Sequence, residues 1–110
     1  MEKLELPRKI RRALKKLRRD IVKVLDENVE VYLFGSYARG DWLEDSDLDL
    51  IVVSDKFKGL SLGERYCLVR KLLPNNISVE ILPYTPEEFK KAKKKSIVLK
   101  DALEYWVRIL

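Results

Sequence analysis

Three short segments with the residue patterns of β-strands constrain the fold of this 110-residue chain more than any other feature. Residues 29–34 alternate between two side-chain faces, as a strand does. Residues 48–53 form a β-branched, apolar run that is interrupted once. In residues 77–82, Val79 and Ile81 fall on the face opposite Glu80. We therefore predict one strand in each segment.

Two further segments have the three-and-four spacing of an amphipathic helix. Pro7, a residue suited to the first turn of a helix, precedes the first of them. Its predicted buried face comprises Ile10, Ala13, Leu14, Leu17, Ile21, Val24 and Leu25. The predicted buried face of the second helix, which Pro74 ends, comprises Leu62, Tyr66, Val69 and Leu73.

The last quarter of the chain contains a clear helix start. Thr85 and Glu88 have the spacing of a capping box, and Pro86 stands at the first helical position between them. Apolar residues at Leu99, Ala102, Leu103 and Trp106 predict a further helix. Residues 106–110 could instead form a short closing strand, and the sequence leaves both alternatives open.

The composition limits the available chemistry. A chain of this length has room for one domain, residues 1–110. Histidine is absent and Cys67 is the single cysteine, which excludes serine–histidine and cysteine–histidine catalysis, internal disulfides and multi-cysteine metal sites. No apolar run of membrane-spanning or secretory-signal type is present, so we expect a cytoplasmic protein. Charged residues make up 37% and glutamine is missing, a bias typical of thermophile proteins.

Two aspartates at the start of the second predicted strand point to metal chemistry. Asp47 and Asp49 are two residues apart, so their side chains leave the same face, with Cα atoms about 6.6 Å apart. Carboxylates at this spacing can converge on divalent cations, and hard oxygen ligands favour Mg²⁺ or Mn²⁺. We expect a third carboxylate from an adjacent strand, and Glu80 is the candidate. An edge-strand glutamate that faces water explains Glu80 equally well.

A glycine-bounded turn follows the first predicted strand. Gly35 permits a tight turn and a close approach of backbone N–H groups to a phosphate, and Ser36 adds a hydroxyl donor. Arg39 lies three residues further on and could contact phosphate oxygens. The informative feature is the coupling of this turn to the aspartate pair, with ten residues between Ser36 and Asp47.

With these two motifs the sequence resembles the minimal nucleotidyltransferases (MNT) of the DNA polymerase beta-like superfamily. The resemblance rests on Gly-Ser-Tyr-Ala-Arg-Gly at residues 35–40 and Ser-Asp-Leu-Asp-Leu at residues 46–50, and it covers nearly the whole chain. It implies an α+β fold with a mixed sheet of about three to five strands flanked by helices, and one nucleotidyltransferase domain. The implied activity is transfer of a nucleoside monophosphate, AMP from ATP, to a hydroxyl group.

The resemblance also implies roles for individual residues. Asp47, Asp49 and Glu80 would be catalytic and would bind two Mg²⁺ or Mn²⁺ ions, while Gly35 and Ser36 would hold the nucleotide phosphates. Glu80 stands where the family commonly has an aspartate. Small MNT proteins resemble the antitoxin half of HEPN/MNT toxin–antitoxin pairs, which implies a HEPN-type partner with a tyrosine as acceptor.

Two other functions stay open at the level of sequence. One is a non-catalytic antitoxin that occludes its partner. The other is a nucleic-acid-binding protein that uses the basic face of the first helix, between Arg8 and Arg19. No aromatic residues interleave with these charges, so a solvated helix face is the simpler interpretation, and we do not expect nucleic acid as a partner. Self-association is also left open.

Overall fold

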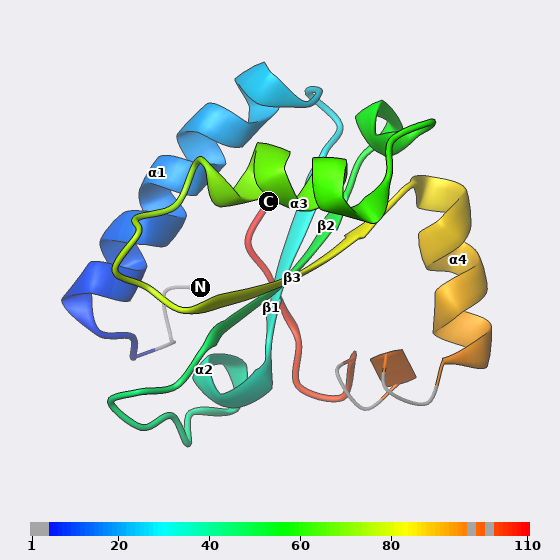
Figure 1. Ribbon diagram of the computed structural model, residues 1–110. Coiled ribbons are helices and arrows are strands. Elements are labelled where there is room, and N and C mark those ends of the chain that lie inside the picture. Colours follow the sequence, from blue (N-terminus) through cyan, green and yellow to red (C-terminus); the bar gives the residue numbers. More distant parts are fainter. Residues whose placement is uncertain (1–4, 97–98, 101–102) are drawn as a thin grey trace.

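A four-stranded mixed sheet forms the centre of the computed structural model, which describes residues 5–96, 99–100 and 103–110 (Figure 1). The strands are β1 (Glu30–Phe34), β2 (Leu48–Val53), β3 (Val79–Tyr84) and β4 (Val107–Arg108), in the order β3-β2-β1-β4. β1 is antiparallel to both β2 and β4, whereas β2 and β3 are parallel. The α+β fold and the three predicted strands are confirmed, although β3 starts and ends two residues later than the pattern indicated.

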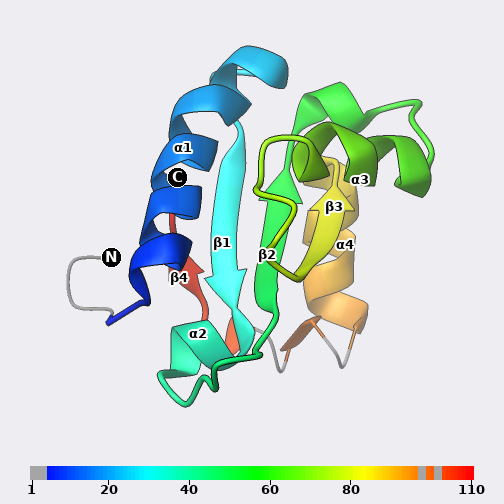
Figure 2. The same cartoon turned by 60° about the vertical axis from the view of Figure 1, so that its left-hand side comes forward.

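One face of the sheet is covered by α1 (Arg8–Val24) and α3 (Leu62–Arg70) (Figure 2). The predicted apolar face of α1 is buried against this side of the sheet, and Leu25 just beyond the helix is buried as well. Val24 is the exception, because the helix ends there and its side chain is 42% exposed.

The buried face of α3 differs from the predicted one. Leu62 and Tyr66 are exposed, whereas Arg65 and Val69 are the buried residues of the helix. The helix is therefore rotated toward Arg65, and this rotation also exposes Cys67.

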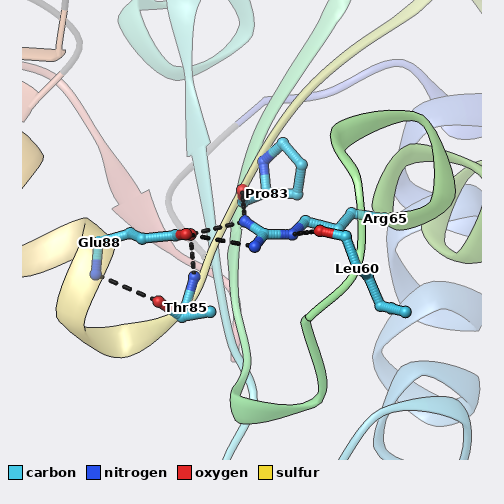
Figure 3. Close-up of polar contacts among 5 residues, drawn as sticks. All are labelled: Leu60, Arg65, Pro83, Thr85 and Glu88. Carbon is cyan, nitrogen blue, oxygen red and sulfur yellow. Dashed lines mark hydrogen bonds and ion pairs between the residues drawn. The ribbon is translucent and has the colours of Figure 1, made fainter. Parts of the chain in front are cut away.

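Arg65 links α3 to the helix on the opposite face of the sheet (Figure 3). Its guanidinium donates to both carboxylate oxygens of Glu88, at 2.6 and 3.2 Å, and to the carbonyl oxygens of Leu60 and Pro83. Glu88 also accepts from the backbone N–H of Thr85 at 2.9 Å, which completes the predicted capping box. All three guanidinium nitrogens of Arg65 thus donate to an oxygen atom. These hydrogen bonds and the ion pair offset the cost of burying the charge.

The second face of the sheet is covered by α4 (Pro86–Lys95) and by the segment after it. Phe89 of α4 and Leu99 pack on alternate residues of the central strands. Leu99, Lys100 and Leu103 are helical, whereas the predicted helical position Ala102 lies outside the described residues. Of the two alternatives for residues 106–110, the strand is correct: β4 pairs with β1, and Trp106 stacks on Tyr32 with ring centroids 4.2 Å apart.

Two short helical segments complete the fold. α2 (Gly35–Arg39) follows β1 directly, and the 3₁₀ turn η1 (Asp55–Phe57) follows β2 and buries Phe57. Across the described part of the chain, every helix is too short or too polar to cross a membrane.

Candidate active site

The register of the sheet brings two of the predicted carboxylates together. Asp49 of β2 is the direct partner of Glu80 of β3, and on its other side it pairs with Phe34, the last residue of β1. Because side chains alternate along a strand, Asp49 shares its face with Ile51 and Val53. Those two residues are buried under the cluster formed with α4, whereas Asp49 is half-buried and Glu80 is exposed. The carboxylate pair therefore lies where the apolar cover of this face ends.

Burial and neighbouring negative charge both raise the pKa of the Asp49 carboxyl group. The pKa of Asp49 is raised to about 7, first by burial and then by the charge of Glu80, a hydrogen bond with Glu80 and the charge of Asp47. The positive charge of Arg39 acts in the opposite direction. Since crowded carboxylates resist full ionisation, this end of the sheet favours a bound cation.

Gly35 makes the position of the Asp49 carboxylate possible. Its φ of +73° lies in the left-handed region, and a Cβ atom built on it would lie 2.0 Å from Oδ2 of Asp49 and 2.9 Å from Cγ. Any larger residue would have to displace this carboxylate. Gly35 is thus required by a close approach of backbone to side chain, as well as by its own backbone conformation.

The loop that leads into β2 is tied down by polar contacts. The Ser46 hydroxyl accepts from the backbone N–H of Leu43 at 2.8 Å, and the Tyr37 hydroxyl donates to the carbonyl oxygen of Ser46 at 3.4 Å. Tyr37 itself is buried in the core. These contacts fix the residue that immediately precedes Asp47. Sequence reasoning missed this anchoring role, whose one signal was a bulky aromatic residue between two glycines.

The remaining predicted residues lie at the same end of the sheet. Ser36 is half-buried in the first turn of α2. Arg39, in the last turn of α2, is exposed, and its Nε lies 3.2 Å from a carboxylate oxygen of Asp41. It is near enough to Asp49 to lower the pKa of that carboxyl group. A positive side chain therefore borders the acidic pair.

The donor set fits a hard divalent cation in its chemistry. Carboxylate oxygens are the ligands that Mg²⁺ and Mn²⁺ prefer, and the mutual repulsion at Asp49 calls for positive charge. Within residues 5–96, 99–100 and 103–110, however, no three His, Cys, Asp or Glu side chains are close enough to hold an ion together. The structure brings Asp49 and Glu80 together and leaves Asp47 exposed just before β2. Glu80 lies beside Asp49 and also faces solvent on the edge strand β3. Its surroundings therefore agree in part with each of the two predictions, a third carboxylate of the site and an edge-strand glutamate that faces water.

Comparison with known protein families shows the family of this chain. A family model described as "Nucleotidyltransferase domain" matches residues 7–105, a range that contains both halves of the glycine–serine and aspartate motif. The chain belongs to this family. It is a nucleotidyltransferase-domain protein, in agreement with the sequence motif and the mixed sheet.

The chain is also similar to individual proteins and solved structures. A Methanocaldococcus jannaschii protein named as a candidate protein adenylyltransferase is 35% identical over a 68-residue alignment, which covers 54% of this chain and 69% of that protein. A crystal structure of a toxin–antitoxin with AMP-PNP has a TM-score of 0.59 at 25% identity, covering 90% of this chain and 71% of that one. A mutant of the toxin–antitoxin MntA-HpeT has a TM-score of 0.57 at 21% identity, over 91% and 71% of the two chains, and shows the fold alone.

Proposed function

We propose that the chain transfers AMP from ATP to a hydroxyl group of a protein partner, a tyrosine of a HEPN-type toxin, and thereby acts as an antitoxin. The observation that carries this proposal is the pairing of Asp49 with Glu80 at the open end of the sheet, against the backbone of Gly35. The name of the M. jannaschii relative supports a protein acceptor. The AMP-PNP in the structure of a similar toxin–antitoxin supports ATP as the donor.

The site residues divide into two groups by role. Asp49 and Glu80, joined by Asp47 from the start of β2, would hold two Mg²⁺ or Mn²⁺ ions. Such ions lower the pKa of an attacking hydroxyl and neutralise the charge of the leaving group. Gly35 and Ser36 would bind phosphate oxygens through backbone N–H groups and the serine hydroxyl.

The transfer itself needs little covalent participation by the protein. The acceptor oxygen attacks the α-phosphorus of ATP, the bond from that phosphorus to the bridging oxygen breaks, and pyrophosphate leaves. Glu80 would accept the hydroxyl proton, because it is exposed beside Asp49 and the chain has no histidine. Arg39 would add positive charge near the phosphates. Positioning and electrostatic stabilisation then supply the catalysis.

The direct test is incubation of the chain with α-labelled ATP, Mg²⁺ and a candidate HEPN-type partner protein. We expect label on the HEPN protein with the wild type and loss of labelling with Asp49→Asn or with EDTA. Asp45→Asn is the matched control, because Asp45 is an exposed aspartate of the preceding loop. Equal labelling by wild type and Asp49→Asn would show that the site is assigned wrongly.

One observation favours a second function, that of a non-catalytic antitoxin that occludes its partner. In the described residues the carboxylates do not form a complete three-ligand group. Calorimetric titration with Mg²⁺ and AMP-PNP separates the two functions. The catalytic proposal requires binding that Asp49→Asn abolishes, whereas an occluding protein inhibits its partner without binding nucleotide.

A further inference from the structure

The positive charge of the protein is concentrated on one helix. α1 contains nine of the 23 basic residues of the chain and one of its 18 acidic residues, Asp20. Subtracting these leaves 14 basic and 17 acidic residues, so the rest of the chain is net acidic. The formal charge of +5 therefore originates on α1.

These basic side chains cover the solvent-facing side of the helix apart from Asp20 and Val24, since the apolar side is buried in the core. All nine are exposed: Arg8, Lys9, Arg11, Arg12, Lys15, Lys16, Arg18, Arg19 and Lys23. Asp20 pairs with Lys16 at 2.9 Å and with Arg19 at 3.3 Å. The other seven have no ion-pair partner within the described residues. A helix of 17 residues extends the charge over about 25 Å.

This arrangement is unfavourable for the helix by itself. Arg8 and Arg12, and likewise Arg11 and Lys15, are like charges four residues apart, a spacing that destabilises a helix. The first turn has no acidic residue and the N-cap makes no side-chain hydrogen bond, although α3 and α4 each begin with a full capping box. A local departure of this kind from helix-stabilising chemistry is expected where a surface has a binding role.

Two hollows border the basic surface of α1. One, of about 460 Å³, lies between α1 and the loop before β3, and its lining includes Arg8, Arg12 and Lys16 together with Asn76. Another, of about 280 Å³, is formed by basic residues of α1 alone, Arg11 among them. Arg8 and Arg12 border both hollows. A ligand seated on α1 would thus meet positive charge in both hollows.

The side chains on this surface indicate the kind of partner. Apart from Val24 in the last turn, the exposed residues of α1 are charged. The centre of a protein interface is typically apolar or aromatic, with arginine enriched and lysine depleted, and single-stranded nucleic acid is held through stacking on aromatic rings. The exposed surface of α1 has no apolar centre and no aromatic residue. An α-helix fits the major groove of B-form DNA, where phosphates flank it on both sides.

We propose, against the expectation from sequence, that α1 binds double-stranded DNA through its phosphate backbone, without reading the base sequence. The lack of aromatic residues counts against single strands, which are held by stacking, and not against a duplex held through its phosphates. Fluorescence anisotropy of a labelled DNA duplex of about 20 base pairs, titrated with the full chain at several salt concentrations, measures this binding. The triple variant Arg11→Gln/Arg12→Gln/Lys15→Gln should bind at least about tenfold more weakly. Its plot of log affinity against log salt should be less steep by about 3, since each phosphate contact contributes about 0.9.

The matched control removes the same charge from another helix. Lys90, Lys91 and Lys94 are exposed on α4, and Lys90→Gln/Lys91→Gln/Lys94→Gln should leave the affinity within about twofold of the wild type. Thermal unfolding of the α1 variant at or above the wild-type temperature shows that weaker binding is not a folding defect.

Four outcomes would overturn the proposal. They are absence of duplex binding at low salt, equal weakening by the two triple variants, an affinity for single-stranded DNA or duplex RNA as high as for duplex DNA, and equally effective competition by polyglutamate, which would indicate an acidic protein surface. Because the assay contains neither ATP nor a toxin, its result is independent of the proposed transfer activity.

Discussion

The contact between Gly35 and Asp49 allows a substitution to separate backbone strain from damage to the site. Gly35, Gly40 and Gly59 all have left-handed φ values, of +73°, +89° and +81°. A Cβ atom on Gly35 would lie 2.0 Å from Oδ2 of Asp49, whereas on Gly40 or Gly59 it would meet no atom within 4 Å. Alanine at the three positions therefore imposes similar strain, and at Gly35 alone it also displaces a carboxylate.

The expected magnitudes follow from these distances. A left-handed alanine costs about 1–2 kcal/mol in the free energy of unfolding, so Gly40→Ala and Gly59→Ala should each lose about that much. At Gly35 the carboxylate must move by on the order of 1 Å to reach an ordinary contact distance. Cβ of Asp49 lies 3.2 Å from the new atom, and side-chain rotation cannot relieve that contact. We expect Gly35→Ala to be the least stable of the three variants.

The functional effect should be confined to Gly35→Ala. A displacement of about 1 Å in a catalytic group can lower a rate by about 100-fold. We therefore expect Gly35→Ala to lose about two orders of magnitude in AMP transfer, and Gly40→Ala and Gly59→Ala to stay close to wild type. Urea unfolding measures the stabilities, and label transfer with calorimetry of Mg²⁺–AMP-PNP binding measures the site.

A double-mutant cycle gives a readout that does not depend on activity. In an Asp49→Ala background the contact of Gly35 with the carboxylate is absent, so Gly35→Ala should cost less there than in the wild type. If the cost is the same in both backgrounds, or if Gly35→Ala transfers AMP as well as Gly40→Ala does, the reasoning from close approach is refuted.

Three further predictions concern the structure outside the site. Arg65→Met should lower the free energy of unfolding in urea by about 2 kcal/mol, less than for a fully buried pair because Glu88 is 46% exposed. Hydrogen bonds from Arg65 and from the backbone of Thr85 hold the pKa of Glu88 below its usual range, so this stabilisation is complete at neutral pH. It should be lost as the pH falls below about 4, and a pH series of thermal unfolding should show a smaller loss in Glu88→Gln. Phe57→Ala should cost about 3–5 kcal/mol in the same urea assay, because the side chain is fully buried.

The parts of the fold that were predictable from sequence are those that short stretches of chain determine. β2 needs only its own apolar run, and α4 begins at a capping box whose residues are three apart. The motif that joins Gly35 to the aspartate pair was predictable for the same reason. Its two halves lie within one stretch of sequence, the connection from β1 to β2.

Features that depend on remote partners were not predictable. Arg65 is buried because Glu88, 23 residues away, neutralises it, and the spacing of apolar residues in α3 contains no sign of this. β4 exists because Tyr32 and Leu33 of β1, far from β4 in the sequence, offer an open strand edge. A pattern within one segment cannot distinguish a closing strand from a helix when the deciding partner is so distant.

The apolar core and the candidate site are determined by the same register. Leu48, Leu50 and Ile81 are buried on the face covered by α1 and α3, and strand alternation then forces Asp49 and Glu80 onto the other face. A slip of one residue between β2 and β3 would bury Glu80 in that core and expose Ile81, which is costly on both counts. The free energy that keeps the core apolar therefore also keeps the two carboxylates opposite each other. Since the cover from α4 stops before Asp49, the same register leaves the carboxylate pair open to solvent at this end of the sheet.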